Sequence, residues 1–152
     1  MSKIITFLWF DNQAEEAANF YTSIFNNSKI TGISHYDKSA AEAANRSVGS
    51  VLTVSFNLAG QNYMALNGGP LFKFTEAISF MVSCEDQAEI DYYWGKLSAD
   101  PEAEQCGWLK DKFGLSWQIV PKNMSELIKT DTAMKAMLNM KKIIIADLIA
   151  AR

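Results

Sequence analysis

The sequence predicts an α+β fold in which two tandem βαβββ modules form a curled mixed sheet, followed by C-terminal helices. Residues 11–15 (DNQAE) recur as residues 85–89 (EDQAE), halfway along the chain. Each copy follows a short apolar run typical of a strand, over 4–10 and 77–84, and each leads into a stretch with helical spacing. A repeat at the same strand-to-helix junction of both halves indicates an internal duplication.

The first module is expected to cover residues 1–70. Its helix should begin at Asp11 or Asn12, because both side chains are good N-caps. Segment 37–47 is polar and Ala/Ser-rich without an apolar period, so we expect a mobile loop there. Residues 68–70 (GGP) end the module. The other expected elements are strands over 4–10, 29–36, 48–58 and 61–67, the last two forming a hairpin around Ala59-Gly60.

The second module is expected to cover residues 71–123, with helices over residues 124–152, so that the chain 1–152 forms a single domain. Its expected elements are a strand over 77–84, a helix over 86–98, and strands over 103–110 and 114–120. The C-terminal helices carry a Met-rich cluster that we interpret as core or dimer packing, formed by Met134, Met137, Leu138 and Met140.

Side-chain alternation along the strands predicts one sheet face that the helices do not cover. Successive side chains of a strand point to opposite faces, so Phe80 and Trp117 are expected to pack under a helix. The opposite face is too apolar in the first module for an ordinary solvent-facing sheet. The residues expected to line a ligand cavity on this face are Phe7, Trp9, Met64, Ser79, Met81 and Gln118. Among them, Trp9 is expected to stack on a flat ligand.

Composition excludes several classes of function. The formal net charge is −3 and 20% of the residues are charged, so there is no broad positive field for nucleic acid or an anionic membrane. No apolar run approaches the roughly 20 residues that span a bilayer, and the N-terminal residues do not resemble a signal peptide. We therefore expect a cytoplasmic protein in which Cys84 and Cys106 are reduced thiols.

Few single residues suggest catalysis. His35 is the only histidine, so an acid–base mechanism near neutral pH would depend on it. It is expected at a strand end, where an ordinary surface role also explains it. Asp111 lies in the turn DKFG, where an aspartate favours chain reversal.

Four segments of the chain resemble one known family. They are FLWFDNQAEEAANFY (7–21), ISFMVSCEDQAEIDYYWGKL (78–97), CGWLKDKFGLSWQIVP (106–121) and MLNMKKIII (137–145). These segments resemble the PhnB-like family, also called 3-demethylubiquinone 3-methyltransferase-like, of the vicinal oxygen chelate (glyoxalase/bleomycin-resistance/dioxygenase) superfamily. The resemblance implies paired βαβββ modules whose strands curl around a concave cavity, commonly in a homodimer.

The resemblance also implies where a metal would bind in such a fold. Metal-dependent members place His, Glu or Gln on the first and last strands of each module. The corresponding positions here fall near Lys3 and Ala77 and at Met64 and Gln118. Three of these residue types are not ligands for a hard divalent ion, so we expect no metal and no cofactor. A methyl donor usually requires a glycine-rich turn that opens a helix, whereas Gly68-Gly69 leads into Pro70.

Three functions remain open at this point. The first is metal-free binding of a small molecule in a concave cavity. The second is an enzyme, either a metal-dependent isomerase or dioxygenase with a relocated site, or the methyltransferase of the family name. The third is a protein whose dimer surface is its purpose. The sequence does not identify the ligand.

Overall fold

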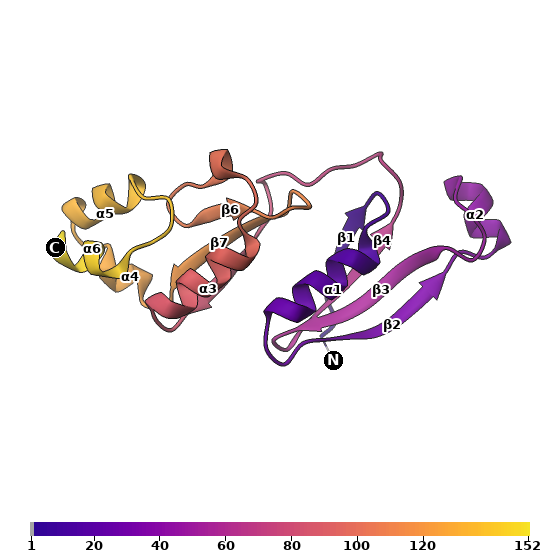
Figure 1. Cartoon of the computed structure of the whole chain (residues 1–152), viewed down its shortest axis with the longest axis horizontal. Coiled ribbons are helices and arrows are strands. Elements are labelled where there is room, and N and C mark those ends of the chain that lie inside the picture. Colours follow the sequence, from indigo (N-terminus) through magenta and orange to yellow (C-terminus); the bar gives the residue numbers. More distant parts are fainter. Residues whose placement is uncertain (1) are drawn as a thin grey trace. The chain divides into compact units, whose positions relative to one another are not determined.

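The computed structural model describes residues 2–152 and separates the chain into two compact units, Met1–Lys73 and Phe74–Arg152 (Figure 1). The strands form two mixed sheets, with the order β1-β4-β3-β2 in the first unit and β5-β7-β6 in the second. The prediction of a duplicated α+β fold with C-terminal helices is confirmed. The strands of the two halves form separate open sheets, however, and not one continuous curled sheet.

The first unit contains one complete βαβββ module. Its elements are β1 (Thr6–Phe10), α1 (Ala14–Ile24), β2 (Lys29–His35), α2 (Lys38–Ala44), β3 (Val51–Leu58) and β4 (Gln61–Asn67). Strand β1 runs parallel to β4, whereas β3 is antiparallel to both of its neighbours. Helix α1 buries its alanine-rich face, and the Tyr21 ring stacks on Phe56 of β3 with ring centroids 6.3 Å apart. Burial of these apolar side chains holds the helix on the sheet.

The start of α1 is capped from the sheet. The N-cap position is Gln13, which makes no capping hydrogen bond through its side chain, so the prediction of Asp11 or Asn12 was wrong. Instead, the backbone N–H of Ala14 donates to Oδ1 of Asn67 at 2.8 Å. Asn67 is 7% exposed and also donates through Nδ2 to the Val51 carbonyl. A residue distant in sequence therefore satisfies a donor at the helix start.

Segment 37–47 is not the loop that the sequence suggested. Residues Lys38–Ala44 form helix α2, because Asp37 accepts a hydrogen bond from the N–H of Ala40 and a run of alanines favours helix. The helix ends at Asn45, which has a left-handed backbone with φ of 54°. The short helix has too few residues to show an apolar period, and only Ala41 is buried in it.

The second unit repeats the plan with three strands. Its elements are β5 (Ser79–Cys84), α3 (Gln87–Leu97), the 3-10 helix η1 (Pro101–Ala103), β6 (Trp108–Lys110), β7 (Ser116–Pro121), α4 (Met124–Leu127), α5 (Asp131–Leu138) and α6 (Ile145–Ala150). The strand expected over 103–110 is shorter because Cys106 and Gly107 have φ angles of 39° and 90°, which are not those of a strand. Side-chain alternation is as predicted: Trp117 is buried and meets Phe80 edge-on at 5.3 Å.

The turn between β6 and β7 is built on one buried carboxylate. Asp111 is 3% exposed and accepts hydrogen bonds from the backbone N–H groups of Phe113 and Leu115. Its second oxygen accepts from the indole N–H of Trp117 at 2.9 Å. The structural role predicted for Asp111 is confirmed, and this residue also orients a core tryptophan.

The C-terminal segment is fastened to the second unit by the start of α3. The amide of Gln87 donates to the Ile143 carbonyl at 2.9 Å and accepts from the Ile145 N–H at 2.8 Å. The backbone N–H groups of Cys106 and Gly107 donate to the carbonyls of Met140 and Lys141. The helices close over a small apolar core of Leu127, Ile143 and Leu148, against which Met124, Met137 and Met140 pack. Across residues 2–152, no helix is both long and apolar enough to cross a membrane.

Candidate ligand cleft

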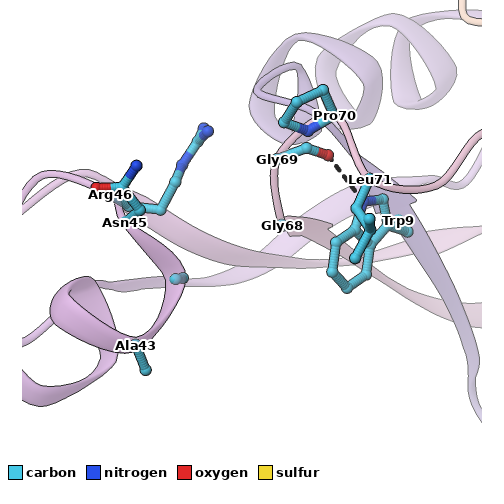
Figure 2. Close-up of a pocket in the computed structure, with 9 residues that line it drawn as sticks. Trp9, Ala43, Asn45, Arg46, Gly68, Gly69, Pro70 and Leu71 are labelled. Carbon is cyan, nitrogen blue, oxygen red and sulfur yellow. Dashed lines mark hydrogen bonds between the residues drawn. The ribbon is translucent and has the colours of Figure 1, made fainter.

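The first unit contains a cleft of about 850 Å³ beside the ends of β1 and β4 (Figure 2). The C-terminal end of α2 forms one wall and the segment that follows β4 forms the other. Its lining residues are Trp9, Ala43, Ala44, Asn45, Arg46, Gly68, Gly69, Pro70 and Leu71. This volume lies within the range of roughly 300–1,000 Å³ common for small-molecule sites.

Trp9 supplies the aromatic surface of the cleft. Strand alternation buries Leu8 and Phe10 and leaves Trp9 partly exposed on the opposite face of β1. Its indole N–H donates to the Gly69 carbonyl at 2.9 Å, and its ring meets Phe72 edge-on with centroids 4.9 Å apart. The indole therefore has a fixed orientation while part of its ring remains open to a ligand.

Two glycines allow the chain to pass close to this ring. A Cβ atom on Gly68 would lie 2.4 Å from Cζ2 of Trp9, a distance that side chains do not tolerate. Gly69 has a φ of 96°, which favours glycine. The N–H groups of Gly68 and Gly69 donate to the carbonyls of Phe10 and Asp11. Both donors are used within the fold, so this glycine pair positions Trp9 and does not cradle a phosphate.

Arg46 is the only charged residue among the nine that line the cleft. Its Nη2 donates to the Asp11 carbonyl at 3.0 Å, and its Nη1 lies 3.7 Å from Oδ1 of Asp11. The Asp11 side chain is 49% exposed and that of Arg46 is 23% exposed. A single long ion pair with an exposed carboxylate neutralises the guanidinium only in part.

The predicted cavity residues of the first module share the sheet face that α1 leaves uncovered. Phe7 of β1 pairs with Met64 of β4, and Trp9 pairs with Leu66. Phe7 is 52% exposed, whereas Met64 and Leu66 are half-buried. Of the three predicted residues on this face, only Trp9 also lines the cleft.

The predicted residues of the second module share the corresponding face of the second sheet. Met81 of β5 pairs with Gln118 of β7, and the Gln118 amide donates to Oγ of Ser79 at 2.9 Å. Met81 is 64% exposed. That these residues and those of the first module line one cavity remains a prediction.

The positions implied for a metal do not fit one. Lys3 and Ala77 precede β1 and β5, whereas the strand residues in register with Met64 and Gln118 are Phe7 and Met81. A phenyl ring, two thioethers and one neutral amide do not hold a hard divalent ion. No three His, Cys, Asp or Glu side chains in the described part of the chain come together as a metal site.

The remaining candidate side chains lie outside the cleft. His35 is exposed at the end of β2 and is not among the lining residues. Cys84 is fully buried, and this burial, together with the nearby acidic Glu89 and Asp86, raises the pKa of its thiol to about 12. Such a thiol is a poor nucleophile near neutral pH. Neither residue forms a catalytic arrangement here.

Sequence reasoning missed most of the cleft. It identified Trp9, but Arg46 and its neighbours were placed in a mobile loop, and residues 68–70 were interpreted only as the end of the first module. The available signal was the pairing of two consecutive glycines with a tryptophan on a facing strand. Close approach of backbone to an aromatic ring requires glycine.

Two α+β units with open mixed sheets define a fold of the vicinal oxygen chelate type. Residues 2–120 match the model of the family described as 3-demethylubiquinone-9 3-methyltransferase. A PhnB protein from Bacillus cereus, described by the same activity, is 39% identical, with 78% of this chain and 99% of that chain covered and a TM-score of 0.64. This chain belongs to the 3-demethylubiquinone-9 3-methyltransferase-like, PhnB-type family.

Two further solved structures are similar to this chain. A protein from Staphylococcus aureus is 30% identical over 81% of this chain and 98% of its own, with a TM-score of 0.35. A protein from Pseudomonas aeruginosa is 15% identical over 80% of this chain and 98% of its own, with a TM-score of 0.60, which shows a common fold alone. Comparison with functionally curated proteins gives no match.

Proposed function

We propose that this protein binds a small molecule with a flat apolar group, without a metal, in the cleft beside Trp9. The observation that carries this proposal is the indole itself, which is held by a hydrogen bond to Gly69 yet remains partly exposed to a cleft of ligand size. A pre-oriented ring binds a planar group with little further loss of conformational freedom.

The other walls support an apolar occupant. Ala43, Ala44, Pro70 and Leu71 offer aliphatic surface, and Leu71 is 74% exposed. Exposure of a large aliphatic side chain beside an aromatic ring is typical of a ligand site. Arg46 provides the polar group that orients the ligand.

The methyl transfer in the family description has less support from the site. The segment after Gly68-Gly69 does not open a helix, since the next helix in the chain is α3 at Gln87. The N–H groups of both glycines are already bonded within the fold. A nucleotide-type methyl donor is usually held by such a turn at a helix start, so ligand binding is the function that we propose.

The test uses a neutral planar probe, 2-naphthamide, and the ¹⁵N-labelled full chain. Titration should shift the indole N–H resonance of Trp9, which is assigned by its loss in Trp9→Phe. We expect a Kd on the order of 1 mM or tighter for a ligand of this size. Gly68→Ala pushes a methyl group into the ring and should weaken binding at least about fivefold through the lost stacking surface.

Gly32→Ala is the matched control, because no atom lies within 4 Å of its added Cβ and it is on β2, outside the cleft. It should bind 2-naphthamide like the natural chain. If the probe shifts no resonance of Trp9, Arg46 or Gly69 up to its solubility limit, the cleft is not a ligand site and the proposal fails.

We also propose that two copies of the chain associate. Support comes from the exposed apolar side chains Phe7, Ile78 and Met81, which are 52%, 68% and 64% exposed in a single chain. Light scattering on the full chain should give twice the monomer mass of 17.0 kDa. A monomer across the micromolar range would contradict this.

A further inference from the structure

We propose that the ligand of the Trp9 cleft is a planar aromatic compound with a single negative charge, whose ring contacts Trp9 and whose carboxylate-like group pairs with Arg46. This inference rests on the proposed function and adds the chemical class of the ligand. It is carried by the position of one incompletely neutralised guanidinium in an otherwise uncharged cleft (Figure 2).

Arg46 retains donors for a further partner. A guanidinium has five N–H donors in a planar fork. Its polar contacts are one hydrogen bond to the Asp11 carbonyl and one ion pair at 3.7 Å to the Asp11 carboxylate. Paired guanidinium and carboxylate groups commonly form two parallel hydrogen bonds instead. A ligand carboxylate therefore finds unused donors on a side chain whose backbone position is already fixed.

The fold itself holds Arg46 at the cleft. Its backbone N–H donates to the Ala41 carbonyl, closing the C-terminal turn of α2. Asn45 takes the left-handed conformation that reverses the chain at this point. The side chain then reaches across to Asp11, which follows β1 directly. Contacts at both ends reduce the entropy that the side chain loses when a ligand binds.

The two recognition groups are separated by a distance that suits one small ligand. The Trp9 ring lies 2.4 Å from the Cβ position of Gly68, and Nη1 of Arg46 lies 3.9 Å from the Cβ position of Gly69. Adjacent Cα atoms are 3.8 Å apart, so the ring and the guanidinium are separated by no more than about 13 Å. A one- or two-ring aromatic acid spans such a gap.

The charge balance limits the ligand to one negative charge. The other eight lining residues are uncharged and offer no second cation. Asp11 adds negative charge beside the guanidinium and disfavours a dianion. A singly charged carboxylate matches one partly neutralised guanidinium.

The experiment compares two probes of nearly identical shape, 2-naphthoate and neutral 2-naphthamide, on the full chain at low ionic strength. We expect 2-naphthoate to bind about tenfold more tightly, the size of one charge-assisted hydrogen bond. Arg46→Gln should abolish this preference, whereas Arg46→Lys should keep part of it and Gly32→Ala should leave the binding of both probes unchanged. Added salt should weaken the naphthoate complex alone.

Two further variants keep the test specific. Lys38→Gln removes the same charge at the other end of α2, outside the cleft, and should leave the preference unchanged. Asp11→Asn removes the competing carboxylate and should raise naphthoate affinity by about two- to threefold. The opposite signs expected for Arg46→Gln and Asp11→Asn distinguish a direct charge contact from a general loss of structure.

The outcomes separate this inference from the proposed function. If both probes bind equally and Arg46→Gln has no effect on either, the ligand is not recognised as an anion, although the cleft remains a ligand site. If neither probe shifts the Trp9 indole resonance, the proposed function itself fails. If naphthoate preference survives Arg46→Gln, another cation binds the anion and the assignment to Arg46 is overturned.

Discussion

Gly68→Ala is the substitution whose effect the structure defines most closely. The new methyl group would lie 2.4, 2.5 and 2.6 Å from three atoms of the Trp9 ring, so the ring must move. Such movement breaks the hydrogen bond from the indole N–H to the Gly69 carbonyl and separates the ring from Phe72. The steric clash therefore acts on two identifiable contacts.

The magnitude follows from these contacts. A hydrogen bond contributes roughly 1 kcal/mol and an aromatic pair about 0.5–1.5 kcal/mol. Replacing glycine by alanine also lowers the conformational entropy of the unfolded chain, which stabilises the folded state by roughly 0.4–1 kcal/mol. Overpacking costs roughly a further 1–3 kcal/mol. Part of this strain is relieved because the partly exposed indole can turn into the cleft. We expect a net destabilisation of about 2 kcal/mol from these opposing effects.

The assay is urea unfolding followed by circular dichroism, with Gly32→Ala as the control. A double-mutant cycle isolates the clash, because Gly68→Ala should cost much less when Trp9 is already leucine. An equal loss of unfolding free energy in both backgrounds would show that Gly68 is required for its backbone and not for the ring. A Gly68→Ala protein as stable as Gly32→Ala would refute the reasoning altogether.

Three other predictions concern the second unit. The buried thiol of Cys84 has a pKa of about 12 in the folded chain against an ordinary 9.0, so its contribution to stability is lost as the pH rises above 9.0. Cys84→Ala should therefore reduce the fall of the unfolding free energy in that alkaline range. Rapid alkylation of native Cys84 at pH 8 would contradict its burial. Asp111→Ala removes the carboxylate that accepts hydrogen bonds from three N–H groups and should cost about 3 kcal/mol in urea unfolding. Exposed Asp131→Ala should cost no more than about 0.5 kcal/mol, and similar losses in the two variants would refute the role of the turn. Gln87→Leu removes both hydrogen bonds to the C-terminal segment and should speed amide hydrogen exchange across residues 143–145. Gln13→Leu, at the equivalent place of the repeated motif in the first unit, should not change this exchange. Unchanged exchange in both variants would show that Gln87 does not hold the C-terminal segment.

The sequence predicted those parts of the fold that depend on local pattern. Alternation placed Trp117 in the core and Gln118 on the opposite face, because strand geometry fixes this relation between neighbours. The repeated motif located both strand-to-helix junctions. Helix α2 escaped prediction because seven residues with one buried alanine carry no periodic signal, and its N-cap, Asp37, also suits a turn.

The site was less accessible from sequence for a different reason. Trp9 could be singled out as an aromatic on the uncovered face of a strand. Its partnership with Arg46 depends on the path of the chain through α2, β3 and β4, which brings residues 43–46 opposite residues 68–71. No local rule specifies that approach. The same is true of Asn67, whose side chain caps a helix that begins 53 positions earlier.

The two glutamines of the repeated motif make different contacts in the two halves of the chain. Both copies of the repeated motif carry a glutamine, but Gln13 occupies the N-cap position of α1 without a capping bond, whereas Gln87 binds residues 143 and 145. The match to the family model ends at residue 120, so Gln87 binds residues that lie outside the matched range. A fragment cut at residue 120 would leave this amide and the N–H groups of Cys106 and Gly107 without their acceptors. Residues beyond position 120 therefore contribute to the stability of the second unit.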